Sequence, residues 1–292
     1  MAFDWNQFAS AIRVTDGAWG TELQKKGVPA GGAPELMNVQ NPASVEVVAR
    51  SYVDAGSDAI ITNTFGGNKY VLEQHGARGR AAELCEAGAA ISRRAAGEQT
   101  VVFGSLGPTG KIVMMQEVPS ESIVEAYREA AEALEWGGAD AIVLETFNEL
   151  DEARLAVQGV KQATDLPVVV SMTFSAGPNK TNTMMGNKPG DLARMAKQEG
   201  ADAVGANCGC GPDNYVTVAS LLREATDLPI WIKSNAGLPE VGSDGKTRFP
   251  MGPEAFAAFV PKLVDAGANF IGGCCGTTPE HIRQVRRAID SL

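Results

Sequence analysis

The chain has 292 residues, 44% of them hydrophobic, and carries a formal net charge of -10 at pH 7. A chain of this size can bury one large core, and α/β barrels of about 250 residues commonly fold as a single domain. The acidic balance provides no basic surface for phosphates, and no apolar run approaches the roughly 20 residues that cross a bilayer, so we expect neither a nucleic-acid partner nor membrane insertion.

Short β-branched runs alternate along the chain with longer segments rich in alanine and glutamate. One of the longer segments, 121–136, places Ile123, Tyr127 and Leu134 along one stripe with charges opposite, which indicates an amphipathic helix. Related peptides, AGSDAII, GGADAIV, EGADAVG and AGANFIG, introduce every second run, each as a helix-ending glycine followed by a buried parallel strand. The predicted strands are 11–16, 58–63, 101–105, 140–145, 167–173, 202–207, 229–234 and 269–273.

Eight uninterrupted βα units favour a closed (β/α)8 TIM barrel, an α/β fold that forms one domain over residues 1–292. An open doubly wound sheet typically carries a Gly-x-Gly-x-x-Gly loop after its first strand, and the corresponding peptide DGAWGTELQ lacks that pattern. Because residues 174–190 are polar and glycine-rich, we expect them to form a substrate-facing loop. The longer excursions that can build the mouth of the barrel are 17–43, 105–120, 174–190 and 235–252.

Polar side chains end several of these apolar strands, at the edge where the active sites of this fold lie. Asp16 follows the first strand, where it either caps the turn or anchors a substrate ammonium. Glu145 ends the fourth strand, and an ionised carboxylate in that apolar setting is costly unless a cation, such as a substrate amine, pairs with it. Asn63 and Asn207 either satisfy loop backbone groups or orient polar groups of a substrate.

Five cysteines, in a chain whose first ten residues lack signal-peptide features, indicate a reducing cytoplasmic location rather than a disulfide framework. Cys85 lies in an alanine-rich helical segment and is expected to pack as a small apolar residue. Cys208 follows the sixth strand, and Cys274 and Cys275 follow the eighth. Because only one strand separates these two in a barrel, the three thiols can converge at the mouth.

Three converging thiols suit zinc, which prefers sulfur ligands, and three protein ligands leave a fourth tetrahedral position for a substrate. Such a centre, with Cys208, Cys274 and Cys275 as ligands, would keep a bound thiol deprotonated near neutral pH. Packing as small apolar residues, or a redox pair, explains the same spacing equally well. Cys210 is a competing position for a metal ligand.

The chain also resembles the homocysteine S-methyltransferases, most closely the homocysteine-binding module of cobalamin-dependent methionine synthase. The resemblance implies a zinc-bearing barrel in which the three converging cysteines bind the metal. It further implies that Asp16, Glu145 and the backbone around Gly17 hold the amino-acid end of homocysteine. The motifs that carry it, in family order, are DGAWGTELQ, TNTFGGN, GSLGPTGK, LETFNELDEA, GANCGCGP and GGCCGTTPEHI.

The resemblance implies that a zinc-activated homocysteine thiolate attacks an activated methyl group and leaves as methionine. GPTGK and GGCCGTTPEHI resemble the cobalamin-dependent branch, but the corrinoid signature Asp-x-His-x-x-Gly is absent, since residues 73–78 read EQHGAR. We therefore expect methylcobalamin to be carried by a separate corrinoid protein. The alternatives are S-methylmethionine, S-adenosylmethionine or betaine as donor, a corrinoid-system methyltransferase for another thiol or methylated compound, and a zinc-binding scaffold without activity.

Overall fold

The barrel predicted from the sequence is present in the computed structural model, which describes residues 3–29, 31–242 and 247–292. Eight parallel strands form one sheet in the order β1-β10-β7-β6-β5-β4-β3-β2, which confirms all eight predicted strands. A parallel bridge between Thr15 and Ala59 brings the two end strands of the sheet together and closes the barrel. The strands are β1 (Arg13–Val14), β2 (Ala59–Ile61), β3 (Val101–Leu106), β4 (Ala141–Phe147), β5 (Val168–Met172), β6 (Ala203–Asn207), β7 (Ile230–Ser234) and β10 (Phe270–Gly273).

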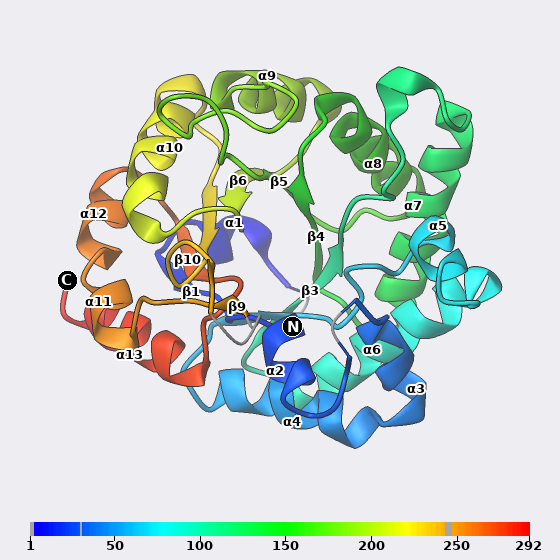
Figure 1. The fold of residues 1–292 in the computed structure, drawn as a ribbon, viewed down its shortest axis with the longest axis horizontal. Coiled ribbons are helices and arrows are strands. Elements are labelled where there is room, and N and C mark those ends of the chain that lie inside the picture. The colour runs from blue at the N-terminus through cyan, green and yellow to red at the C-terminus, as the bar shows by residue number, and fades with distance from the viewer. Residues whose placement is uncertain (1–2, 30, 243–246) are drawn as a thin grey trace.

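A ring of helices surrounds the strands (Figure 1). The predicted amphipathic helix is α7, and its buried face includes Ile123, Tyr127 and Leu134. No helix in the described part of the chain combines the length and apolarity needed to span a bilayer. The α-helices are α1 (Trp5–Ala9), α2 (Gly20–Gln24), α3 (Met37–Gln40), α4 (Pro42–Val53), α5 (Lys69–Glu73), α6 (Ala81–Ala96), α7 (Ser120–Trp136), α8 (Leu150–Ala163), α9 (Pro189–Glu199), α10 (Pro212–Ala225), α11 (Pro253–Ala257), α12 (Val260–Asp265) and α13 (Pro279–Asp290), with short 3-10 helices at Pro34–Leu36, Arg78–Arg80 and Val113–Met115.

The short helix α1 closes the end of the barrel at which the strands begin. Its Trp5 ring stacks on Phe270 at a centroid distance of 5.7 Å, and Phe103 packs against Trp231 at 5.1 Å. Phe8, from the same helix, approaches the rings of Phe103 and Phe270. These aromatic side chains fill the lower interior, so the end at which the strands finish is the open one.

The four repeated peptides of the sequence share one hydrogen-bonding device, which we call the strand clasp. In each, an aspartate or asparagine makes two hydrogen bonds to one residue of the preceding barrel strand. Its backbone N–H donates to the carbonyl of that strand residue, and its side-chain oxygen accepts the backbone N–H of that strand residue. Asp58 and Val14 make these two bonds at 2.8 and 2.7 Å. Each repeated peptide therefore marks a strand clasp, and the four clasps join β1 to β2, β3 to β4, β5 to β6 and β7 to β10. The other clasps join Asp140 to Val102, Asp202 to Val168 and Asn269 to Ile230.

The structure contains short elements that the sequence did not predict, and one of them is a β-hairpin at the barrel mouth. Within the excursion at 235–252, β8 (Glu240–Val241) pairs with β9 (Thr247–Arg248) in an antiparallel hairpin. Each strand is two residues long, which is too short for a recognisable strand pattern. Residues 243–246 of this excursion, residue 30 of the excursion at 17–43 and residues 1–2 at the start of the chain lie outside the described residues.

Replacing Asp58 by alanine tests the strand clasp. Asp58→Ala removes the bond to Val14 and the 3.0 Å ion pair with Arg286. Because the buried N–H of Val14 loses its acceptor, we expect the free energy of unfolding to fall by about 1–3 kcal/mol. Urea denaturation followed by circular dichroism measures the change. Asp265→Ala, at an exposed position of α12, is the matched control, and an equal loss in both variants would contradict the assignment.

Candidate metal centre and adjoining cavity

The three thiols predicted to converge do so at the mouth of the barrel. Cys208, directly after β6, donates its backbone N–H to Lys233 O at 3.0 Å. Cys274, directly after β10, donates its own to Ser234 O at 2.7 Å. Both acceptors belong to β7, the strand between β6 and β10. The Sγ atom of Cys275 lies 3.9 Å from that of Cys208 and 4.0 Å from that of Cys274, and all three fall within 4.8 Å of one another.

Cys208 adopts a backbone conformation that residues other than glycine rarely take. Its φ is 62°, and that of Gly209 is 66°, both in the left-handed region. The Tyr215 hydroxyl of α10 donates to the backbone oxygens of Asn207 and Cys208, at 2.9 and 2.5 Å, and so fixes the turn. Thr146, at the irregular end of β4, has a φ of 69°. Such residues cost about 1–3 kcal/mol each and cluster at binding and catalytic sites.

The three thiols change the acidity of one another. Hydrogen bonds from Cys274 and Cys275 lower the pKa of the Cys208 thiol, and a hydrogen bond from the Asn235 side chain adds to this effect. The contact with Cys208 is the largest cause of the raised pKa of both Cys274 and Cys275. The cluster therefore favours a thiolate on Cys208, and the thiolate is the form of cysteine that binds metals.

The sulfur geometry fits a tetrahedral metal ion. Zinc–sulfur bonds of about 2.3 Å in a tetrahedron place two sulfur ligands about 3.8 Å apart. The distances of 3.9 and 4.0 Å between these thiols are close to that spacing. The cluster of Cys208, Cys274 and Cys275 can therefore hold a metal ion.

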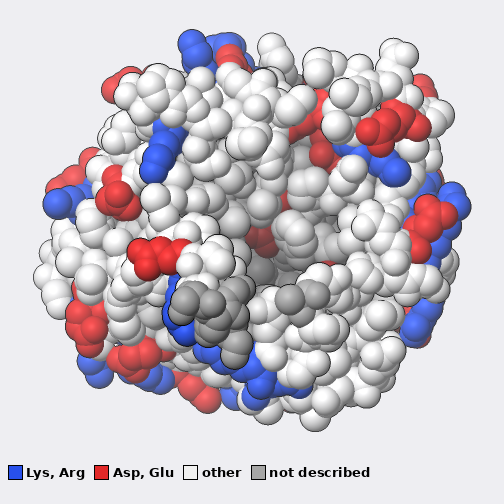
Figure 2. All heavy atoms as spheres, viewed as in Figure 1, with Lys and Arg blue, Asp and Glu red and all other residues white. Residues whose placement is uncertain are grey.

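A cavity of about 350 Å³ adjoins the sulfur cluster. The face that contains the barrel mouth is hollowed at its centre, with acidic atoms at the base and mostly uncharged side chains around the rim (Figure 2). Gly17, Asn63 and Glu145, all predicted substrate contacts, line the cavity together with the three cysteines. Asp16 and Asn207 are fully buried and bond to residues that line it. The predicted residues thus gather at one place.

Glu145 presents its carboxylate to this cavity. The Ser105 hydroxyl donates to Oε1 at 2.6 Å, and the Asn207 amide approaches Oε2 at 3.4 Å. Burial raises the pKa of Glu145, and the charge of Lys233 opposes that rise. Because Oε2 has only one long contact among the described residues, it retains the capacity to accept a further donor from the cavity.

Two asparagines support the loops around the cavity. Asn207 Oδ1 accepts the N–H of Thr146 at 2.8 Å and the hydroxyl of Ser171 at 2.7 Å, while its Nδ2 donates to the Thr146 hydroxyl at 2.7 Å. Asn63 donates to Pro34 O at 2.7 Å. Loop support is one of the two roles that the sequence left open for these residues, and direct contact with a substrate stays a prediction.

Asp16 pairs with a lysine that the sequence reasoning did not include in the site. Lys233 is 2% exposed, and its Nζ lies 2.5 Å from Asp16 Oδ1. Asp16 Oδ2 accepts the indole N–H of Trp19 at 2.6 Å and the backbone N–H of Ile61 at 2.8 Å. Burial acts to lower the pKa of Lys233, but the charges of Asp16 and Glu145 outweigh it and raise the pKa. The available signal was a lysine inside the apolar run PIWIKS. A substrate ammonium at Asp16 stays a prediction.

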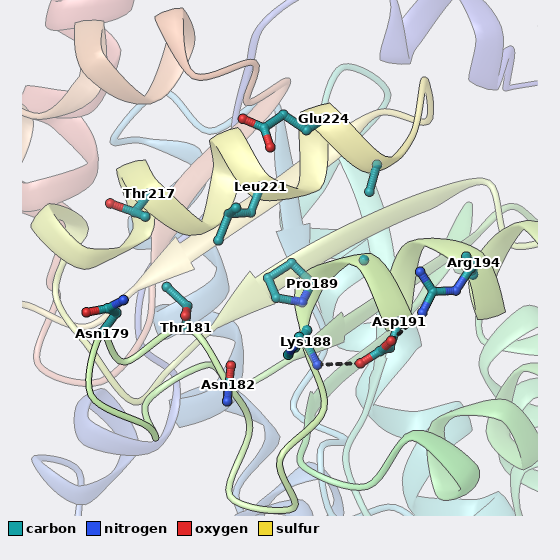
Figure 3. A pocket seen from close by; sticks show the side chains of 12 residues that line it. Asn179, Thr181, Asn182, Lys188, Pro189, Asp191, Arg194, Thr217, Leu221 and Glu224 are labelled. Atoms are coloured by element: carbon teal, nitrogen blue, oxygen red, sulfur yellow. Dashed lines mark hydrogen bonds and ion pairs between the residues drawn. The ribbon is translucent and has the colours of Figure 1, made fainter.

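The excursion at 174–190 does not line the central cavity. It borders a larger, open groove of about 1060 Å³, beside the start of α9 and one face of α10 (Figure 3). In this groove, Asn179 and Thr181 of the loop lie opposite Thr217 and Leu221 of α10. None of the cysteines lines this groove. We therefore identify the smaller central cavity as the candidate site, because it adjoins the sulfur cluster.

The remaining two cysteines stand apart from the cluster. Cys85 is fully buried in α6, where its thiol donates to Gly67 O at 3.3 Å, which confirms the prediction of a small packed residue. Cys210 is also buried, and burial raises its pKa. Neither belongs to the group of metal-ligating side chains found among the described residues.

Known proteins are similar to this chain both in sequence and in fold. The sequence matches the family model described as homocysteine S-methyltransferase over residues 13–289. It is 34% identical to methionine synthase of Mycobacterium tuberculosis and 33% identical to that of Mycobacterium leprae, in each case over 96% of this chain. The metallated form of the homocysteine methyltransferase MmuM from Escherichia coli matches its fold with a TM-score of 0.78, at 22% identity, over 95% of this chain and 96% of its own.

The two methionine synthases are much longer than the region they share with this chain. The aligned part covers 25% of the first and 24% of the second. The chain therefore spans about a quarter of the length of these relatives.

Substitution of the clustered thiols tests the metal centre. Cys208→Ser, Cys274→Ser and Cys275→Ser should each lose bound zinc while the barrel stays folded, because these residues lie on the rim and not in the core. Metal content after zinc loading measures the loss, and circular dichroism checks the fold. Cys85→Ser, which replaces a thiol remote from the cluster, is the matched control. Full zinc in all three rim variants would refute the ligand set.

Proposed function

Because the chain belongs to the homocysteine S-methyltransferase family, we propose that it transfers a methyl group to the thiol of homocysteine and forms methionine. The observation that carries the proposal is the position of the three thiols, on the wall of a cavity that also presents Glu145. Homocysteine needs a soft cation for its sulfur and a counter-charge for its ammonium, and these residues suit both needs. We assign residues 1–292 to one homocysteine-binding barrel domain.

Cys208, Cys274 and Cys275 are the proposed ligands of a zinc ion. Bound zinc would keep the substrate sulfur deprotonated and nucleophilic near neutral pH, below the ordinary thiol pKa of about 8.5. The protein supplies a rigid support for the ligands, because β7 fixes the backbone at both strand ends. The substrate sulfur forms its bond to the methyl carbon as the bond from that carbon to the donor breaks, and the donor keeps the electron pair. No protein base is required at the methyl carbon.

Glu145 and the backbone at Gly17 are the groups that we assign to the amino-acid end of homocysteine. Glu145 Oε2 can accept a hydrogen bond from the substrate ammonium, while the Asn207 amide keeps the carboxylate of Glu145 oriented. Gly17 leaves no room for a side chain, since a Cβ there would come within 2.8 Å of the Tyr52 ring and 2.9 Å of Thr277 Oγ1. This glycine lets the backbone of the first loop form part of the cavity wall.

The proposed methyl donor is methylcobalamin carried by a separate corrinoid protein. The motifs GPTGK and GGCCGTTPEHI, which resemble the cobalamin-dependent branch, support this choice. The two relatives named methionine synthase, at 34% and 33% identity, support homocysteine as the acceptor. A cavity of about 350 Å³ has the size of a small-molecule site and would leave no space for a corrinoid beside homocysteine. The donor would therefore meet the sulfur at the open mouth of the barrel.

A panel of methyl donors tests the function. Zinc-loaded protein with homocysteine should form methionine from free methylcobalamin, and chelation should abolish the activity until zinc is restored. S-methylmethionine, S-adenosylmethionine and betaine complete the panel. Methionine from one of these three and none from methylcobalamin would overturn the donor. Turnover of a different thiol, with none of homocysteine, would overturn the substrate.

Glu145→Gln preserves the shape of the side chain and removes its charge. If Glu145 pairs with the substrate ammonium, the KM for homocysteine should rise about 10- to 100-fold, as expected for the loss of a hydrogen bond to a charged group. The matched control is 4-mercaptobutyrate, which is homocysteine without its amine, and its KM should not change. An equal rise for both thiols would mean that Glu145 supports the cavity without pairing with the amine.

A further inference from the structure

Among the described residues that line the sulfur cavity, Lys233 is the only lysine, and there is no arginine. Its side chain is almost completely buried. A buried ammonium is costly unless an anion pairs with it. The partner is Asp16, whose Oδ1 lies 2.5 Å from Nζ. This ion pair joins β7 to the end of β1, across the intervening strand β10.

The same ion pair holds further parts of the cavity wall. The second oxygen of Asp16 accepts hydrogen bonds from Trp19 and Ile61, and both of these residues line the cavity. Lys233 therefore fixes the orientation of Asp16 in which those two bonds form. Without the ammonium, a buried carboxylate would lose its counter-charge and its fixed position.

The charge balance of the cavity involves Lys233 as well. Asp16, Glu145 and the cysteine cluster are all anionic or potentially anionic, and a substrate thiolate would add another negative charge beside them. Zn²⁺ with three thiolates still carries a net negative charge. Because the carboxylate of Asp16 balances the ammonium of Lys233, the pair adds no net charge to the wall, and its contribution is to hold the wall in place.

We infer that Lys233 is a positioning residue for the thiolate substrate: its ammonium fixes Asp16 behind the cavity wall, and Asp16 in turn holds Trp19 and Ile61 in the wall beside the cysteine cluster. The inference rests on the proposed function, because the ligand is the same thiol. An exposure of 2% and the bond to Asp16 favour this role over direct contact with the substrate carboxylate.

The test uses the double variant Asp16→Asn/Lys233→Met, which removes both charges and leaves neither buried without a partner. Lys161→Met is the matched control, because Lys161 forms a 2.8 Å ion pair with Asp202 where both side chains are 31% exposed. Circular dichroism and zinc content establish that each variant folds and holds metal. Each protein is then loaded with Co²⁺, whose absorption spectrum reports thiolate binding without turnover. The titrants are homocysteine and 3-mercapto-1-propanol, a thiol without amine or carboxylate.

The inference predicts that the double variant folds, holds metal and binds both thiols with a Kd raised at least about tenfold, while Lys161→Met leaves both values unchanged. A rise for homocysteine alone would place Lys233 or Asp16 in contact with its charged groups. Unchanged Kd values would make the ion pair purely structural, and a double variant that does not fold would make it a requirement of folding. Each of these three results overturns the inference. If the wild-type protein binds neither thiol, the proposed function fails too.

Discussion

The candidate site depends on the way β7 holds the ends of its two neighbours. Two consecutive carbonyl groups of this strand, those of Lys233 and Ser234, accept the N–H groups of Cys208 and Cys274. Sulfur ligands need to be held to within about half an ångström for a defined metal geometry. Residues at the ends of hydrogen-bonded strands are held with that precision better than residues of free loops. The side chain of Lys233 extends from the same strand into the wall of the cavity. One strand therefore supports the sulfur atoms and supplies the cation beside them.

The fold was predictable from the sequence because buried parallel strands are continuous apolar runs. The predicted strand 140–145 corresponds to β4, and its neighbours match equally closely. The first strand, Arg13–Val14, is shorter than the predicted 11–16, and Thr15 beyond it forms only an isolated bridge with Ala59. The hairpin of β8 and β9 escaped prediction, since two-residue strands have no periodicity.

The site was predictable where chain order alone determines proximity. Cys208 and Cys274 were expected to converge because the order of strands in a barrel follows their order in the chain. The pairing of Asp16 with Lys233 was not predictable, because it depends on how far each side chain reaches across β10. Composition described residues 174–190 correctly as a polar loop, but it carries no information on the direction in which such a loop points.

The buried ion pair connects positions that are 217 residues apart in the sequence. During synthesis the first strand leaves the ribosome long before β7, and the carboxylate of Asp16 has to remain hydrated until the ammonium of Lys233 arrives. Pairing of β1 with β10 requires a segment that emerges later still. The Asp16–Lys233 pair and the pairing of β1 with β10 therefore both wait until most of the chain has been synthesised.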